Sequence, residues 1–412
     1  MIEDELAGAA GARRRRWLFD VPDFRRLWLV GLVVFSVRWL EMLAVGVFVY
    51  QRTGSPFLVA LMTMLRMLPM ALFGAVAGVV ADRLERRTAL IVVIVLMLST
   101  SLSLALLAFA GRLAIWHLAV ASFINGMAWA TDNPVRRVMI GEVIGPARMS
   151  AAMSVDVGAN TASRMLGPTV GGLLLASIGI DGAFAVSVAF YLAALGAALK
   201  LAYRNSAPTR QTGSVLARLL EGLSLARRDR RLSGTLVVTV IYNVFGWPFT
   251  SMIPVIGQDS LHLQAQGIGV LASMDGVGAC VGAVLIALLS RPAYYTQIYI
   301  GGVVVYLVML IVVALVPDPV SAGLVLLATG LSSVCFSIMQ ATLVYLAAPP
   351  EMRSRLYGIL SLCIGLGPIG FLHLGLMADW IGAPDAVIVS GLEGLVAMAL
   401  TWRWWRPTGR AG

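Results

Sequence analysis

Charged residues are scarce in this chain. Asp, Glu, Lys and Arg make up only 13% of its 412 residues, and 59% of the residues are hydrophobic, whereas a soluble domain carries about 25% charge. A water-soluble surface cannot be built from this composition, so most of the chain must face lipid or other helices. The shortage of charge therefore predicts an integral membrane protein.

Lysine, histidine and cysteine are also nearly absent. The only lysine, Lys200, lies in Ala-Leu-Lys-Leu-Ala, so the chain lacks the Gly-Lys-Ser/Thr phosphate loop of an ATP-driven pump. Its three histidines are scattered without metal-ligand spacing. Its three cysteines form an odd set inside apolar runs, which argues against a disulfide framework. We therefore expect no cofactor, no metal and no enzymatic activity.

Long apolar runs are abundant instead. Each is long enough to cross a bilayer as a helix, because a span needs roughly 20 apolar residues and a helix satisfies its own backbone in lipid. The predicted spans are 27–50, 58–80, 88–110, 115–135, 150–178, 182–202, 233–256, 266–289, 294–316, 320–345, 354–378 and 383–405. They predict an all-α fold of twelve transmembrane helices with this division: an N-terminal segment (1–26), a six-helix bundle (27–202), a linker (203–232), a second six-helix bundle (233–405) and a tail (406–412).

The net charge of +10 comes from arginines that gather on one side of these spans. If the N-terminus is inside, the opposite side carries only Arg52 and Arg112. The positive-inside rule then predicts an even number of spans with both termini in the cytoplasm. We expect a multi-pass protein of the plasma membrane, specifically a bacterial inner membrane. Nucleic acid is not an expected partner, because the basic residues do not gather in a soluble domain.

The linker and a repeat add to this organisation. Val215, Leu216, Leu219, Leu220 and Leu223 follow a helical spacing that predicts an amphipathic helix on the inner leaflet. This helix either ties the two halves together or serves regulation or partner binding. A Gly-Pro pair followed fifteen residues later by Gly-Ala occurs twice, 200 residues apart. The copies fall on the fifth and eleventh spans, as a six-plus-six repeat predicts.

Several short motifs resemble those of one family. Residues 78–87, GVVADRLERR, match G-x-x-x-D-R-x-x-R-R, the loop-two-to-three signature of the major facilitator superfamily. Further similar motifs are Val49-Tyr50 with Thr53-Gly54-Ser55-Pro56, Asn133-Pro134 through Arg137, and Gly167-Pro168-x-x-Gly171-Gly172, which resembles the antiporter signature. The chain is similar to the enterobactin-exporter-like, drug-efflux branch. This resemblance implies two six-helix bundles, a midplane cavity, alternating access and export of small molecules, often against protons.

The chain departs from the family pattern at two places. Many proton-coupled members carry an arginine in the fourth span, where this chain has Ser122 ahead of Gly126. The loop after the eighth span, Ser290-Arg291-Pro292-Ala293, is a poor copy of the first signature. Because of the first departure, the sequence does not identify which residues would relay a proton.

Polar residues inside the apolar runs are the candidates for a proton or substrate cavity, because ionisable groups within a membrane usually face a cavity or a partner. Arg38 and Glu41 are spaced to share one helix face, either as a carboxylate held for a proton or cation, or as a neutralised structural pair. Arg164 is an expected contact for an anion or carboxylate. The full set is Arg38, Glu41, Arg66, Arg164, Asn243, Trp247, Asp275, Ser333, Ser337 and Gln340. Polar contacts that only join helices are the alternative for each.

A second set is expected to control conformation. Asp82 could accept hydrogen bonds across the bundle interface in only one state, whereas the arginines that follow it could simply anchor topology. The Gly-Pro segment of the fifth span could be a hinge or a close helix seam. The set is Gly78, Asp82, Arg83, Arg86, Arg87, Asp156, Gly167, Pro168, Gly171 and Gly172.

These patterns together predict a secondary active transporter. It exports a small amphipathic molecule by alternating access in exchange for protons. Uptake or facilitated diffusion by the same fold is the main alternative, followed by lipid flipping and a transport-dead sensor. The expected partners are a small-molecule substrate and membrane lipid, and we expect a monomer.

Overall fold

The computed structural model describes residues 18–83, 85–145, 148–203, 223–224, 229–349 and 352–405, and for residues 73–83, 353 and 354 only the backbone. In these ranges the regular structure is helical, and nine helices are long and apolar enough to cross a membrane. The helical prediction is therefore confirmed for the described residues. The amphipathic helix expected in the linker lies outside them.

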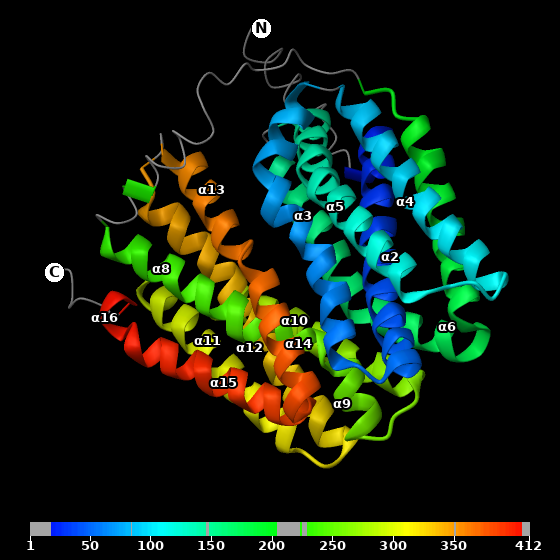
Figure 1. The fold of residues 1–412 in the computed structure, drawn as a ribbon. Helices are drawn as coiled ribbons and strands as arrows, with labels where there is room; N and C mark the ends of the chain where they lie inside the picture. The colour runs from blue at the N-terminus through cyan, green and yellow to red at the C-terminus, as the bar shows by residue number, and fades with distance from the viewer. Residues whose placement is uncertain are drawn as a thin grey trace, which may run out of the picture.

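Five long helices form the N-terminal half (Figure 1). After a short turn of 3-10 helix, η1 (Leu18–Asp20), they are α2 (Pro22–Thr53), α3 (Pro56–Arg83), α4 (Arg86–Phe109), α5 (Ile115–Ile144) and α6 (Met149–Leu199). Helix α2 packs along α6, α3 along α5, and α4 against both α5 and α6. Their apolar faces enclose buried core residues such as Phe24, Leu90 and Tyr191.

Helix α6 is two spans joined at a single residue. Its 51 residues would extend about 75 Å at 1.5 Å per residue, more than twice the roughly 30 Å hydrocarbon core of a bilayer. Gly179 breaks it, with φ 73° and ψ −178°, a backbone conformation that favours glycine because a Cβ would be strained there. The two spans predicted at 150–178 and 182–202 thus meet in a very tight turn.

The C-terminal half contains more interruptions. Helix α8 (Arg230–Ile241) passes into a π-helical turn, η3 (Tyr242–Gly246), and a 3-10 segment, η4 (Trp247–Ser251), before α9 (Ile253–Asp259). The remaining elements are α10 (Ala265–Leu289), η5 (Pro292–Tyr294), α11 (Tyr295–Leu315), α12 (Pro319–Ala347), α13 (Arg353–Ile364), α14 (Gly367–Ile381), α15 (Ala383–Leu400) and α16 (Trp402–Trp405). Helix α12 packs on α10 and α11, and α15 packs on α11 and α14.

The two Gly-Pro copies behave differently. Gly167 and Pro168 lie within α6, which continues through them as a helix. Gly367 and Pro368 instead begin α14, after α13 ends at Ile364. Proline fits the first turn of a helix because its missing N–H has no partner there in any case. The repeat found in the sequence therefore marks a continuous helix in one half and a helix break in the other.

The two halves meet along α6 with α10 and along α3 with α14. Figure 1 shows them converging toward the lower end of the view and diverging toward the upper end. We call the end that carries the α2–α3 and α14–α15 connections, where Gly54 and Gly382 line one cavity, the Gly54 end. The opposite end, which carries Tyr203 after α6, is called the Tyr203 end.

Candidate functional site

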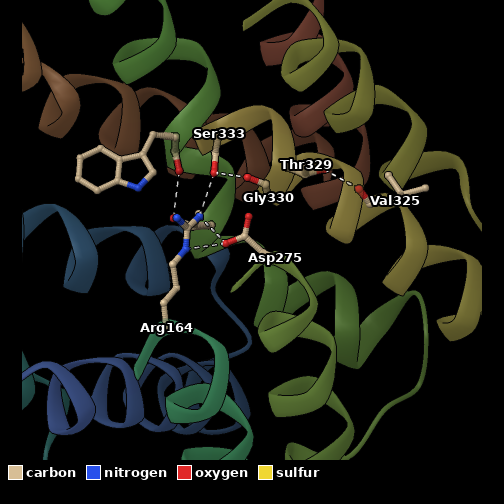
Figure 2. Close-up of polar contacts among 8 residues, drawn as sticks. Arg164, Asp275, Val325, Thr329, Gly330 and Ser333 are labelled. Atoms are coloured by element: carbon tan, nitrogen blue, oxygen red, sulfur yellow. Dashed lines mark hydrogen bonds and ion pairs between the residues drawn. The ribbon is translucent and has the colours of Figure 1, made fainter. Parts of the chain in front are cut away.

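An ion pair joins the two halves between residues near the middle of the first arm of α6 and of α10 (Figure 2). Arg164 of α6 donates to Asp275 of α10, with Nε 3.0 Å and Nη2 2.5 Å from the same carboxylate oxygen. Nη2 also lies 3.3 Å from the hydroxyl of Ser333 on α12, which itself donates to the carbonyl of Gly330. Three predicted site residues, Arg164, Asp275 and Ser333, are thus brought together from both halves.

A small cavity adjoins this ion pair. Its volume is about 40 Å³, enough for water but not for a drug-sized molecule, whose pockets measure roughly 300–1,000 Å³. Both halves contribute to its wall: Trp39, Met42, Leu43, Gly46, Val59, Thr63, Arg164, Pro168, Thr250, Ser251, Ile253, Pro254, Ala272 and Asp275. The wall is mainly apolar, with the one ion pair and a few hydroxyls as its polar groups.

A seam of small residues holds α6 against α10 beside the pair. A Cβ on Gly276 would lie 2.6 Å from the Cα of Met165 and 2.7 Å from the carbonyl oxygen of Arg164, so only glycine permits this approach. One helical turn away, the hydroxyls of Thr169 and Ser273 are 2.7 Å apart. The backbone contact therefore fixes how far Arg164 must reach to meet Asp275.

Glu41 does not pair with Arg38 as the sequence predicted. Among the described residues, its carboxylate accepts hydrogen bonds from Ser101 at 2.8 Å and from Asn125 at 3.4 Å, and Arg66 interacts with it electrostatically. The i,i+3 spacing places Arg38 and Glu41 on neighbouring positions, but neighbouring helices supply better partners. Glu41 and Arg66 form a buried polar group within the N-terminal half and do not line the cavity.

The remaining cavity candidates lie elsewhere. Asn243 donates 2.8 Å to the carbonyl of Thr239 in its own helix, and Ser337 donates to Val334. Gln340 donates 2.8 Å to the hydroxyl of Thr239, which joins α12 to α8. Trp247 packs edge-on against Phe371 at 5.9 Å between ring centroids. Gln340 and Trp247 thus join helices, whereas Asn243 and Ser337 bond to the backbone of their own helices.

The loop signature is described only in part. The side chains of Gly78, Asp82 and Arg83 lie outside the described residues. Arg86 contacts Glu142 and the hydroxyl of Tyr203, and Arg87 donates 2.8 Å to the carbonyl of Leu199. These contacts stay within the N-terminal half, so they fasten the Tyr203 end of one bundle rather than bridge the interface. Burial and the hydrogen bond to Glu142 raise the pKa of Tyr203, so it remains a donor at neutral pH.

Asp156 belongs to a buried charge cluster that the sequence did not reveal. It accepts a hydrogen bond from Arg136, which also lies 3.6 Å from Asp132, and Arg137 lies 3.6 Å from its second oxygen. Arg136 is completely buried and stacks on the ring of Phe35. From the sequence, Arg136 counts among the arginines of the cytoplasmic side, and Asp132 was not a predicted site residue. The i,i+4 spacing of the two was the available signal.

The glycines of the fifth-span motif form a helix seam. A Cβ on Gly167 would lie 2.6 Å from the Cβ of Trp39, and one on Gly171 would lie 2.6 Å from the carbonyl oxygen of Leu40. Gly172 faces Ala265 of α10 in the same way. These contacts support the close helix seam that was one of the two interpretations of this motif, and a hinge here remains a prediction.

Two hydrogen bonds link the halves at the Gly54 end. The hydroxyl of Tyr50 donates to Asp259, and the hydroxyl of Ser55 donates 2.8 Å to Asp379. In both cases the N-terminal half supplies the donor and the C-terminal half the carboxylate. Tyr50, Asp259 and Asp379 line a cavity of about 350 Å³ at this end. The molecule is thus fastened across its halves at this end.

A family model described as a transmembrane secretion effector matches residues 19–411. The chain belongs to this family, within the major facilitator superfamily. This family member is 21% identical over 373 residues to macrolide efflux protein A of Streptococcus pyogenes, covering 89% of the chain and 92% of that protein. It is 25% identical over 390 residues to the multidrug efflux pump Tap of Mycolicibacterium fortuitum, covering 90% and 91%. The predicted superfamily and drug-efflux branch are therefore confirmed.

The fold of this family member is also that of solved transporters. The crystal structure of the nucleoside transporter NupG superposes with a TM-score of 0.75 at 12% identity, covering 93% of this chain and 99% of that one. At this identity the likeness concerns the fold alone. Together with the apolar helices, the family match identifies a multi-pass membrane transporter.

Proposed function

We propose that the protein exports a small amphipathic molecule by alternating access in exchange for protons. It does so as a monomer with twelve transmembrane helices, both termini in the cytoplasm and no ATP site, in the plasma membrane of a bacterium. The named efflux activities of two relatives support the direction of transport.

The Arg164–Asp275 ion pair is the observation that supports coupling. One charge comes from each half, and the pair lies beside the cavity between them. When the halves separate at this level, the pair must break, and two unpaired charges inside a membrane are costly. A proton on Asp275 removes one of these two charges, and an anionic substrate group removes the other cost by pairing with Arg164. Separation of the halves is thereby linked to proton or substrate binding.

The location of the interhalf hydrogen bonds supports a particular state. They lie at the ion pair and at the Gly54 end, while the halves diverge toward the Tyr203 end (Figure 1). The arginine-rich loops at the Tyr203 end support a cytoplasmic location for it by the positive-inside rule. The described conformation is therefore closed to the outside and faces inward.

Transport in inverted membrane vesicles tests the proposal. The probes are a labelled macrolide, 2-naphthoate and 2-naphthylmethylammonium, which cover neutral-to-basic, anionic and cationic amphiphiles. We expect an acid lumen to drive accumulation of at least one probe, because protons leave as the substrate enters the lumen. Asp275→Asn should abolish the response to the gradient, and Asp385→Asn, an exposed carboxylate on α15, should leave it intact.

Two outcomes would contradict proton exchange. Entry of a probe that reaches only equilibrium and does not respond to the gradient favours facilitated diffusion. A full gradient response in the Asp275→Asn variant removes this carboxylate from the coupling.

A further inference from the structure

We propose that Arg38, Trp39 and Trp129 form an anion site in the middle of the N-terminal half, and that the transported molecule carries a carboxylate, sulfonate or phosphate group on an aromatic body. This inference rests on the proposed function, because it names the substrate class of the same transport route. It is carried by hydrogen-bond donors that lack acceptors and by a charge that lacks a counter-charge.

The Arg38 side chain is buried but unpaired. Only 9% of its surface is exposed, and within the described residues it makes neither a hydrogen bond nor an ion pair. Its guanidinium carbon lies 3.7 Å from the ring centroid of Trp129 and 5.6 Å from that of Trp39. Stacking on aromatic rings stabilises the cation but leaves its N–H groups without acceptors.

Both tryptophans beside Arg38 also carry donors without partners. The indole Nε1 atoms of Trp39 and Trp129 and the Nε of Arg38 are buried without partners in the described part of the chain. Buried donors in native structures are normally paired. Three unpaired donors therefore belong to one guanidinium and to the two rings nearest to it, and an acceptor would complete this group.

The charged groups around Arg38 also favour an anionic ligand. Arg66 and Arg164 are near enough to Arg38 to repel it. Arg66 has Glu41 nearby and Arg164 is paired with Asp275, whereas no described carboxylate pairs with Arg38. The residue lies near the centre of α2, which spans Pro22–Thr53, where an unpaired charge is least tolerated. An incoming anion would supply the missing counter-charge, and a cation would be repelled.

The geometry fits the ligand class. A guanidinium binds the two oxygens of a carboxylate or phosphate through parallel hydrogen bonds, and the indoles offer flat apolar faces together with N–H donors. Trp39 also connects this place with the transport route, because it lines the interhalf cavity and its ring lies 5.8 Å from the guanidinium carbon of Arg164. The cavity of about 40 Å³ is too small for an aromatic ring, so the ligand enters when the halves part.

A charge series on one ring system tests the site by direct binding. The purified full-length protein in nanodiscs is titrated calorimetrically with 2-naphthoate, 2-naphthylmethylammonium and 2-naphthalenemethanol. We expect the anion to bind about tenfold or more tightly than the other two, the range that hydrogen bonds to a charged group provide. Arg38→Gln should remove this preference, and Arg38→Lys should retain part of it. Arg112→Gln, an exposed arginine outside the helices, is the matched control.

Each result decides the matter. Equal binding of the three probes, no binding of 2-naphthoate, or a folded Arg38→Gln variant with unchanged preference overturns the proposal, since water alone would then satisfy the donors. If Arg38 variants do not fold, the wild-type series and the Trp129→Phe variant test the proposal. Phenylalanine keeps a ring but removes the N–H donor, so this variant should bind 2-naphthoate about threefold or more weakly. Binding is measured without a gradient. A protein that prefers the anion yet transports nothing therefore refutes the proposed function alone.

Discussion

At the scale of the residue, Gly31 shows how a buried charge constrains its surroundings. A Cβ at this position would lie 2.6 Å from the guanidinium carbon of Arg136, which is fixed by Asp156 and the ring of Phe35. We therefore expect Gly31→Ala to destabilise the protein by about 1–3 kcal/mol, the usual cost of overpacking. The melting temperature of the purified protein in detergent measures this.

Gly158→Ala is the matched control for that change. It lies in α6 with no atom within 4 Å of the added Cβ, so the higher helix propensity of alanine should stabilise it by up to about 1 kcal/mol. Equal melting temperatures for Gly31→Ala and Gly158→Ala would mean that Arg136 can move aside.

Residue-scale contacts were also the hardest to predict from the sequence. The spacing of Arg38 and Glu41 identified two neighbours on one helix but not their partners, because Trp129, Ser101 and Asn125 come from α4 and α5. Helix spacing says which side chains lie on the same face, whereas the choice of partner depends on which other helix lies there. Arg164 and Asp275 were both identified as cavity candidates, and only the fold shows that they meet.

At the scale of the element, two glycines on α10 pack against different halves of the molecule. Gly276 faces the backbone of Arg164 and Met165 across the interface, and Gly278 faces Leu327 of α12 in its own half. We expect Gly276→Ala to push α6 away from α10 and to disfavour the closed state by about 1–3 kcal/mol. Gly278→Ala should lower thermal stability instead and leave that equilibrium unchanged.

The accessibility of Ser55→Cys to a water-soluble thiol reagent reports this equilibrium at the Gly54 end. Labelling should be faster with Gly276→Ala than with Gly278→Ala. Equal labelling rates would show that the α6–α10 seam does not control closure.

Element boundaries followed from the sequence more readily than contacts did. Apolar run length predicted α2, α10 and α15 to within a few residues at most of their ends, because the thickness of a bilayer sets the length of a span. The π-helical turn at Tyr242–Gly246 and the break before Gly367 left no comparable signal. The same Gly-Pro pair continues a helix in α6 and begins one in α14, so packing around the pair decides the outcome.

At the scale of the whole molecule, closure of the Gly54 end is open to direct test. Ser55 and Asp379 are joined by a hydrogen bond, so cysteines at both positions should react with a short bifunctional thiol reagent in a background without the three native cysteines. The link should reduce transport at least about tenfold, because alternating access requires this end to open, and reductive cleavage of the reagent should restore it. A linked protein that transports at the full rate would contradict alternating access.

The orientation of the chain is a second prediction at this scale. Reporter fusions after residues 111, 181 and 317 should be active outside the cell, and fusions after residues 203 and 291 should be active inside. The reason is the small number of arginines in the first set of connections. An outside signal from the fusion after residue 203 would refute an even number of spans with both ends in the cytoplasm.

The tight turn at Gly179 has a mechanical consequence. The first arm of α6, from Met149 to the turn, is about 45 Å long at 1.5 Å per residue, and Arg164 lies near its midpoint. If the arm pivots at the ion pair, a tilt of about 20° swings each tip by about 8 Å in opposite directions. Because only one residue at the turn is non-helical, the second arm moves together with the first. A small rotation about the ion pair therefore displaces the helix ends by about the width of an aromatic ring system.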